Sequence, residues 1–292
     1  MKTKHSLLRL ASIAYDTPHL ITTHSLDKML SYLDLRNEGL VPMFIKDNDD
    51  DSTSSEEKSK LDKGLGYVKV DGAITYKPVT GACGEVKGTS YVGLLNSVEE
   101  LVEEGVKTIV MDFSTPGGQA SHAFEHASEI RALADTNGVE LVGYVDEMAC
   151  SAGYLLACIC DEVIANPDAI TGSIGAVVAL TDVSKAMDNA GVKRVFITSG
   201  SSKVPFAEDG SFKQEFLTKI QKDVDMLNDK FAEHVSKYTG LAVEDIKALN
   251  AETFNADEAL EIGLINSIMT NSEFAAYISA KHKAKTKGAI NA

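Results

Sequence analysis

The stretch VELVGYVDEMACSAGYLLA (residues 139–157) changes its character midway. Its first part, residues 139–147, is rich in β-branched and aromatic side chains and predicts a strand. Its second part places the small residues Ser151, Ala152 and Gly153 before an apolar run and predicts a helix that begins near Ser151. A strand that leads directly into a helix is the building unit of an α/β fold.

The same alternation continues on both sides of this stretch. Further strands are expected at residues 65–74, 107–113, 161–167 and 192–200. Helical periodicity lies between them and again at about 211–238, which ends at Gly240, and in a last helix that opens at Asn255 or Ala256 and ends at Gly263. Strands that alternate with helices imply right-handed crossovers. We therefore predict an α/β fold with a mostly parallel sheet flanked by helices.

Changes in composition suggest four regions along the chain. Residues 1–45 contain amphipathic helical segments and are expected to form a helical N-terminal arm. Residues 46–60 combine acidic and hydroxyl side chains without an apolar anchor, as in a flexible acidic linker. Residues 61–270 carry the α/β pattern, and residues 271–292 end in a basic, Ala-rich tail with little to bury.

Overall composition limits the possible partners. With 292 residues, 44% of them hydrophobic, the chain can bury a large core, and its net charge of −15 argues against binding a phosphate backbone. No run of about 18 uncharged apolar residues is present, and Arg9 interrupts the apolar start. We expect no nucleic-acid partner, no membrane partner and a cytoplasmic location.

Metal and cofactor sites are not expected. The cysteines at positions 83, 150, 158 and 160 are predicted to be reduced, since no His or Cys follows them at a zinc-binding spacing. His122 and His126 are four residues apart and share one helix face. We favour a solvent-facing or capping role for this pair, with a metal or catalytic role as the alternative.

Ser151 is the candidate nucleophile. It falls near a helix N-terminus, where unpaired N–H groups stabilise developing negative charge. Gly117 and Gly118 follow another predicted strand, so their backbone N–H groups could approach a substrate carbonyl at the same sheet edge. The alternative is that Ser151 is a small residue that allows close helix packing.

A serine nucleophile needs a base. No histidine follows Ser151 for more than eighty residues. Lys203, in the loop SSKVPF after the predicted strand 192–200, could serve if burial kept its amine neutral. A solvated surface charge is the alternative reading of Lys203.

Five segments in this order resemble the signal peptide peptidase A type of serine peptidase: STPGGQA, MACSAGYLLA, DEVIANPDAITGSIG, SGSSKVPF and FNADEALEIGLIN. That family shares its fold with the Clp protease and crotonase superfamily. The segments LASIAYDTPHLI and FAEHVSKYTGL further resemble bacteriophage head-maturation proteases of the minor capsid protein C type. The resemblance covers roughly residues 6–270, interrupted by the acidic linker.

The resemblance assigns roles to particular residues. It implies a Ser/Lys dyad in which Ser151 is the nucleophile and Lys203 the general base, with Ser173 orienting the lysine amine. Gly117 or Gly118, with the N–H of Ala152, would form the oxyanion hole. Ala152-Gly153 stands where relatives often carry Gly-Gly, a difference that leaves the backbone donor in place. No metal or nucleotide cofactor is implied.

The resemblance also implies a biological role. A phage protease of this type would cleave scaffold, capsid or portal proteins inside the assembling prohead, within the cytoplasm of the bacterial host, as a homo-oligomer. One alternative is a bacterial cytosolic peptidase that acts on signal-peptide fragments. Another is a non-catalytic head scaffolding protein, and the fold alone would also allow a crotonase-like acyl-CoA enzyme.

Overall fold

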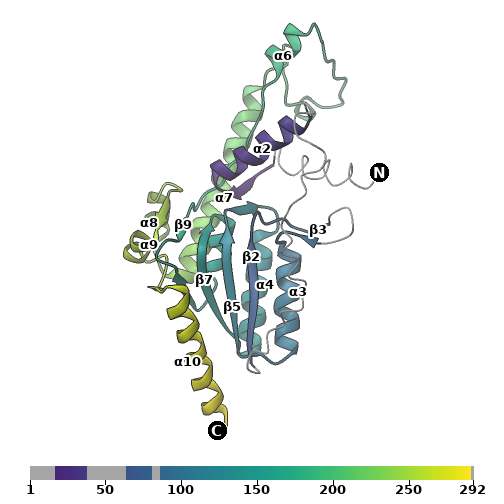
Figure 1. Cartoon of the computed structure of the whole chain (residues 1–292). Helices are drawn as coiled ribbons and strands as arrows, with labels where there is room; N and C mark the ends of the chain where they lie inside the picture. Colours follow the sequence, from purple (N-terminus) through teal and green to yellow (C-terminus); the bar gives the residue numbers. More distant parts are fainter. Residues whose placement is uncertain (1–16, 38–63, 81–85, 291–292) are drawn as a thin grey trace.

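A computed structural model describes residues 17–37, 64–80 and 86–290, and its centre is one large sheet (Figure 1). Among these residues the sheet has seven strands, in the order β10-β9-β7-β5-β2, with β8 beside β7 and β11 beside β8. The strands are β2 (Leu65–Asp71), β5 (Thr108–Thr115), β7 (Glu140–Cys150), β8 (Glu162–Ala165), β9 (Ile170–Gly172), β10 (Thr253–Asn255) and β11 (Ser267–Ile268). All pairs are parallel except β10 with β9. The predicted mostly parallel α/β sheet is confirmed.

Strand β7 is long enough to have two neighbours on one side. Its residues 142–145 pair with β8, and its residues 148–150 pair with β9. On the other side it pairs with β5 along most of its length. The carboxyl ends of β5, β7 and β9 therefore meet at one edge of the sheet.

Helices cover both faces of the sheet, because side chains of a strand alternate between its faces. Ile109, Met111 and Phe113 of β5 point into the main core, together with the helices α3 (Tyr91–Glu103), α4 (Ala123–Asn137) and α5 (Ala152–Ala157). Val110 lies on the opposite face in a smaller cluster with α10 (Asn271–Ile290). The remaining helices are α2 (Thr23–Asn37), α6 (Ser184–Asn189), α7 (Gln214–Thr239), α8 (Val243–Ala248) and α9 (Ala256–Ile262).

Two short strand pairs lie outside the main sheet. Strand β1 (His19–Ile21) pairs antiparallel with β6 (Gly117–Gln119), and β3 (Val79–Thr80) pairs with β4 (Val86–Lys87). Leu20 of β1 is completely buried in the main core. Within the predicted N-terminal arm, therefore, the described residues 17–37 include a strand that joins the body of the protein.

The prediction of a strand at residues 192–200 is wrong. Residues 193–198 adopt neither helix nor strand, and the side chains of Val195 and Ile197 are 72% and 98% exposed. They belong to residues 178–213, here called the projecting segment, which carries α6 away from the sheet (Figure 1). β-branched composition stabilises a strand through pairing and burial, and the described part of the chain offers this segment neither.

The C-terminal region buries more than its composition suggested. Phe274 and Ile278 of α10 pack in the smaller cluster, and Lys281 bonds to Glu140 and Glu162 at 3.1 and 2.7 Å. Residues 271–283 thus cover one face of the sheet, whereas the sequence suggested a tail with little to bury. The predicted linker, residues 46–60, lies outside the described residues. No helix in the described ranges has the length and apolarity needed to cross a bilayer.

Candidate active site

Ser151 occupies a sharp turn between β7 and α5. Its backbone has φ 53° and ψ −116°, a conformation that is strained for a residue with a side chain. Its N–H donates to the Gly172 carbonyl at 2.8 Å, and its Oγ donates to the Gly175 carbonyl at 3.3 Å. The side chain is completely buried. The turn therefore fixes the hydroxyl at the edge where β5, β7 and β9 end.

Gly117 and Gly118 lie beside this turn, and neighbouring backbone atoms leave no room for a side chain at either position. A Cβ atom at Gly117 would lie 2.1 Å from the Leu20 carbonyl oxygen and 3.0 Å from that of Cys150. At Gly118 it would lie 2.0 Å from the Ile74 carbonyl oxygen. The Gly117 N–H donates to the Thr115 hydroxyl at 3.2 Å. The predicted close approach of bare backbone is present at both glycines.

Ala152 begins α5 directly after Ser151 and is also completely buried. Its N–H makes no hydrogen bond to any described residue, as is usual in the first turn of a helix. A carbonyl oxygen that accepted this N–H would lie next to the Ser151 hydroxyl. The N–H of Ala152 is thus an available donor beside the candidate nucleophile.

Ser173 lies in the loop that wraps around Ser151, since its neighbours Gly172 and Gly175 accept the two Ser151 hydrogen bonds. It has a positive φ of 51°, and its N–H donates to the Glu252 carbonyl at 2.7 Å. The structure therefore brings Ser173 to the same edge of the sheet as the candidate nucleophile.

Lys203 lies elsewhere, at the end of the short 3₁₀ helix η1 (Ser201–Lys203) on the projecting segment. Its side chain is exposed, and within the described ranges no hydrogen bond or ion pair joins it to Ser151 or Ser173. The single chain thus assembles the serine, the glycines and the Ala152 donor, and leaves the candidate base in solvent.

Cys150 precedes Ser151, and Cys158 and Cys160 follow α5; none of these three cysteines is bonded to another. Burial raises the pKa of Cys150 to about 12, and burial also raises the pKa of the Cys158 and Cys160 thiols. A thiol with a raised pKa stays protonated at neutral pH and is a weak nucleophile and metal ligand. Cys83 lies outside the described residues.

His234 supports α5 from behind, a contact that the sequence patterns did not predict. From α7 its buried Nε2 donates to the Leu155 carbonyl of α5 at 3.0 Å. Burial lowers the pKa of His234 to about 4, so the ring is neutral at pH 7. The position of His234 in an amphipathic helix was the only sequence signal of its burial. Its partner Leu155 lies seventy-nine residues away in the chain, so the sequence could not indicate the bond.

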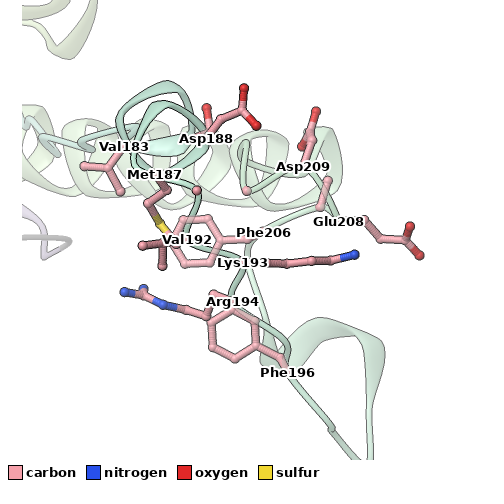
Figure 2. A pocket seen from close by; sticks show the side chains of 14 residues that line it. Val183, Met187, Asp188, Val192, Lys193, Arg194, Phe196, Phe206, Glu208 and Asp209 are labelled. Carbon is pink, nitrogen blue, oxygen red and sulfur yellow. The ribbon is translucent and has the colours of Figure 1, made fainter.

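The projecting segment holds a separate cavity of about 380 Å³ (Figure 2). Apolar side chains of Met187, Val192, Phe196 and Phe206 line it, with charged side chains around them. It shares no lining residue with the Ser151 turn. No pattern in the sequence had indicated this cavity, because residues 192–196 in its wall were predicted as part of a strand and its other walls come from residues 183–191 and 206–210.

Comparison with known proteins identifies the family. The chain is 29% identical over 227 residues to "Capsid assembly protease C" of Escherichia phage lambda, which covers 77% of this chain and 51% of that protein. It is 27% identical to "Head-tail preconnector protein GP5" of Enterobacteria phage P21, over 77% of this chain and 44% of that protein. "Probable protease SohB" of Haemophilus influenzae is 24% identical, over 73% and 60% respectively.

The chain thus spans about half the length of the phage relatives that it matches. The sequence profile of peptidase family S49 matches residues 134–286, just over half of the chain. This range includes Ser151, Ser173 and Lys203, and it confirms the resemblance seen in the sequence motifs. With its mostly parallel, helix-flanked sheet, the chain belongs to peptidase family S49.

Proposed function

We propose that this chain is a serine endopeptidase with Ser151 as nucleophile and Lys203 as general base. One observation carries the proposal: the strained turn at Ser151, where φ is 53°, presents the hydroxyl next to the unbonded N–H of Ala152. Strained backbone of this kind is retained where the surrounding structure and the function require it. A packing role for a small residue would need neither the strain nor the adjacent donor.

In this mechanism neutral Lys203 accepts the proton of Ser151 as Oγ attacks the carbonyl carbon of a peptide bond. The tetrahedral oxyanion is stabilised by the N–H of Ala152 and by an N–H of Gly117 or Gly118. The Lys203 ammonium then protonates the leaving amine, and Ser173 orients it. Water attacks the acyl-enzyme with Lys203 again as base and restores the Ser151 hydroxyl.

The exposed position of Lys203 requires a further step. A lysine acts as a base at neutral pH when desolvation lowers its pKa. We propose that the protein is a homo-oligomer in which the projecting segment packs against a second copy and Lys203 becomes buried near a Ser151. Residues 183–204 of the segment have four basic side chains and one acidic one, although the whole segment has five and four, and the whole chain has a net charge of −15. The basic part, residues 183–204, thus complements the acidic surface of another copy.

The proposed biological role is cleavage of scaffold, capsid or portal proteins in an assembling phage prohead, inside the bacterial host. It is supported by the names of the two phage relatives, a capsid assembly protease and a head-tail preconnector protein. A bacterial peptidase that acts on signal-peptide fragments is the second candidate, supported by the SohB relative. A non-catalytic head scaffolding protein is the third.

Labelling with a fluorophosphonate probe, together with cleavage of the scaffold protein encoded in the same genome, tests the proposal. We expect Ser151→Ala to lose both, and Lys203→Met to lower cleavage by about 10²–10⁴-fold. Lys107→Met, which removes an exposed charge outside the projecting segment, is the matched control and should cleave normally. Full labelling of Ser151→Ala would exclude this nucleophile, and full activity of Lys203→Met would exclude this base.

A further inference from the structure

A second group of chemically reactive side chains lies at the start of α4, apart from Ser151. One ligand atom from each of His122, Glu125 and His126 can be chosen so that the three lie within 4.8 Å of one another. Two imidazoles and one carboxylate form a donor set that suits divalent ions of the zinc type. To bind such an ion, each of the three side chains must present a lone pair to it.

The tautomer of His126 is set by its surroundings. Its Nδ1 lies 3.0 Å from the backbone carbonyl of His122, which can only accept a hydrogen bond. Nδ1 therefore carries the hydrogen, and Nε2 presents its lone pair. Nε2 makes no hydrogen bond to a described residue. A histidine whose other ring nitrogen is fixed by a carbonyl is the usual arrangement of a metal ligand.

His122 and Glu125 already approach each other. Nδ1 of His122 lies 2.7 Å from a carboxylate oxygen of Glu125. His122 has a positive φ of 63° and makes no capping hydrogen bond with its side chain. The Tyr76 ring stacks on His122 at 4.0 Å and meets the His126 ring edge-on at 5.7 Å. The strained backbone and the tyrosine hold both rings on one side of α4.

We propose that His122, Glu125 and His126 bind one divalent transition-metal ion of the zinc type, with water at a fourth position. Tetrahedral coordination at about 2.0–2.1 Å needs ligand atoms roughly 3.3 Å apart. The side chains of His122 and Glu125 are 41% and 59% exposed. Small rotations of these two side chains can therefore bring their ligand atoms to this separation without disturbing the core. His126, which is nearly buried, is the fixed ligand.

The metal would connect α4 to the strand with the candidate oxyanion glycines. Strand β6 ends at Gln119, whose side-chain oxygen accepts from the N–H of Tyr76 at 2.7 Å and whose carbonyl accepts from the Tyr91 hydroxyl at 2.7 Å. Tyr76 contacts both histidines. An ion bound there is thus expected to stabilise the folded chain around β6, since a ligand of the folded state raises its melting temperature.

Titration of the full-length, untagged protein with Co²⁺ and Zn²⁺ tests the proposal. We expect one equivalent of Co²⁺ to give a visible absorption spectrum of tetrahedral type, displaced by Zn²⁺, and each metal to raise the melting temperature. His126→Gln and Glu125→Gln should each weaken binding by about tenfold or more. Cys83→Ser removes the thiol that could compete, and should bind the metal as the wild type does.

His24→Gln is the matched control, because His24 and Asp27 form an exposed His/acid pair at the start of α2 without a second histidine. It should bind as tightly as the wild type. The proposal is overturned if the wild type shows no Co²⁺ spectrum, or if His126→Gln binds as tightly as His24→Gln. Neither readout depends on peptidase activity, so a failed proteolysis assay leaves the result interpretable.

A different observation carries a second inference, which rests on the proposed function. Strand β1 lies along β6, the strand that carries the candidate oxyanion glycines. It pairs with β6 on one side, and His19 exchanges two backbone hydrogen bonds with Val177 on the other, at 2.8 and 3.0 Å. Residues 19–21 are almost completely buried. The position of Gly117 between the carbonyls of Leu20 and Cys150 places β1 beside the residue that precedes Ser151.

Extended peptides bind to proteases and other domains by adding a strand to an open edge. Because β1 already pairs with β6, a substrate strand cannot pair with the same edge of β6, the strand that contains Gly117 and Gly118. We infer that residues 18–22 occupy the peptide groove of this chain and act as an internal inhibitor. Substrate binding then requires β1 to leave β6.

The rate of fluorophosphonate labelling at Ser151 tests this inference. Leu20→Ala removes the buried side chain that anchors β1 and should increase the rate several-fold. Ile130→Ala makes a comparable cavity in α4, away from β1, and should not. Equal rates in the wild type and both variants would overturn the inhibitory role and leave the proposed function intact. Absence of labelling in all three would instead refute the nucleophile, and the inhibitory role with it.

Discussion

Single residues at the carboxyl edge of the sheet combine strain with close packing. Ser151 and Ser173 both have positive φ angles without being glycine, and their segments are held together by the hydrogen bond from Ser151 to Gly172. Each such residue costs about 1–3 kcal/mol of stability. The hydrogen bonds and burial around Ser151 offset this cost, so the turn persists only while its neighbours are intact.

Gly118 tests how tightly this edge is packed. Because a Cβ atom there would lie 2.0 Å from the backbone oxygen of Ile74, Gly118→Ala should lower the free energy of unfolding by more than about 3 kcal/mol. Gly200→Ala is the control, since nothing lies within 4 Å of its Cβ position, and it should change stability by less than about 0.5 kcal/mol. Urea unfolding measures both, and equal stability of the two variants would contradict the packing described.

His234 makes stability depend on pH. Its pKa falls from 6.5 when unfolded to about 4 when folded, because burial disfavours the charged ring. The unfolded chain therefore binds the proton first as the pH falls. The stabilisation is fully present above about pH 6.5 and is lost towards pH 4, by roughly 3 kcal/mol.

His234→Gln keeps a donor for the Leu155 carbonyl but does not titrate. The difference in unfolding free energy between wild type and variant, measured by urea unfolding at several pH values, should shrink between pH 6.5 and 4. A difference that stays constant over this range would show that His234 is protonated equally in both states.

At the scale of helices and strands, local sequence signals set where an element begins and ends, and packing sets where it lies in the molecule. Helix α9 begins where its sequence says it should, because Asn255 and Glu258 form a reciprocal capping box and Gly263 ends it with a φ of 89°. Helix α10 also has a local start signal, since Thr270 and Glu273 bond reciprocally before it. Its Phe274 stacks on Tyr144 of β7 with ring centroids 4.1 Å apart, so packing against the sheet keeps α10 in place.

Phe274→Ala tests this packing. It should lower the free energy of unfolding by about 3–5 kcal/mol, because a buried aromatic side chain is lost and a cavity remains. Ser279→Ala, at an exposed position on the same helix, should have almost no effect. Thermal or urea unfolding compares them, and a loss below about 1 kcal/mol for Phe274→Ala would mean that α10 does not hold the sheet.

At the scale of the whole molecule, the chain consists of a layered body and the projecting segment (Figure 1). The segment exposes Val195, Phe196 and Ile197 next to basic side chains. Soluble proteins seldom expose several large apolar side chains together unless a partner covers them. This exposure and the solvated Lys203 have a common explanation in a second copy.

Ile197→Glu should therefore dissociate the oligomer or weaken it strongly, since it would place a charge in an apolar contact. Sedimentation velocity of wild type and variant measures the change, and the variant should also lose peptidase activity. Leu260→Glu, on the exposed part of α9, is the control and should sediment like the wild type. A wild type that sediments as a monomer at every concentration would refute the proposed oligomer.

The sequence by itself determined the elements whose signals are local. The β-branched runs of β2, β5 and β7, the small residues after β7 and the glycine stops of α7 and α9 follow from backbone preference and periodicity, which act within a few residues. The paired glycines Gly117 and Gly118 could also be identified from the sequence. These signals, with the order of the motifs, were sufficient for the α/β sheet and the peptidase family.

Only the tertiary structure decided what depends on distant partners. The run at 192–200 has strand composition but no described strand beside it, so it forms none, while Ile170–Gly172 becomes β9 because β7 and β10 lie on either side. The same reason separates Ser151, fixed by its own turn, from Lys203, exposed in the single chain. Pairing and burial are interactions between surfaces far apart in sequence, and a local pattern cannot specify them.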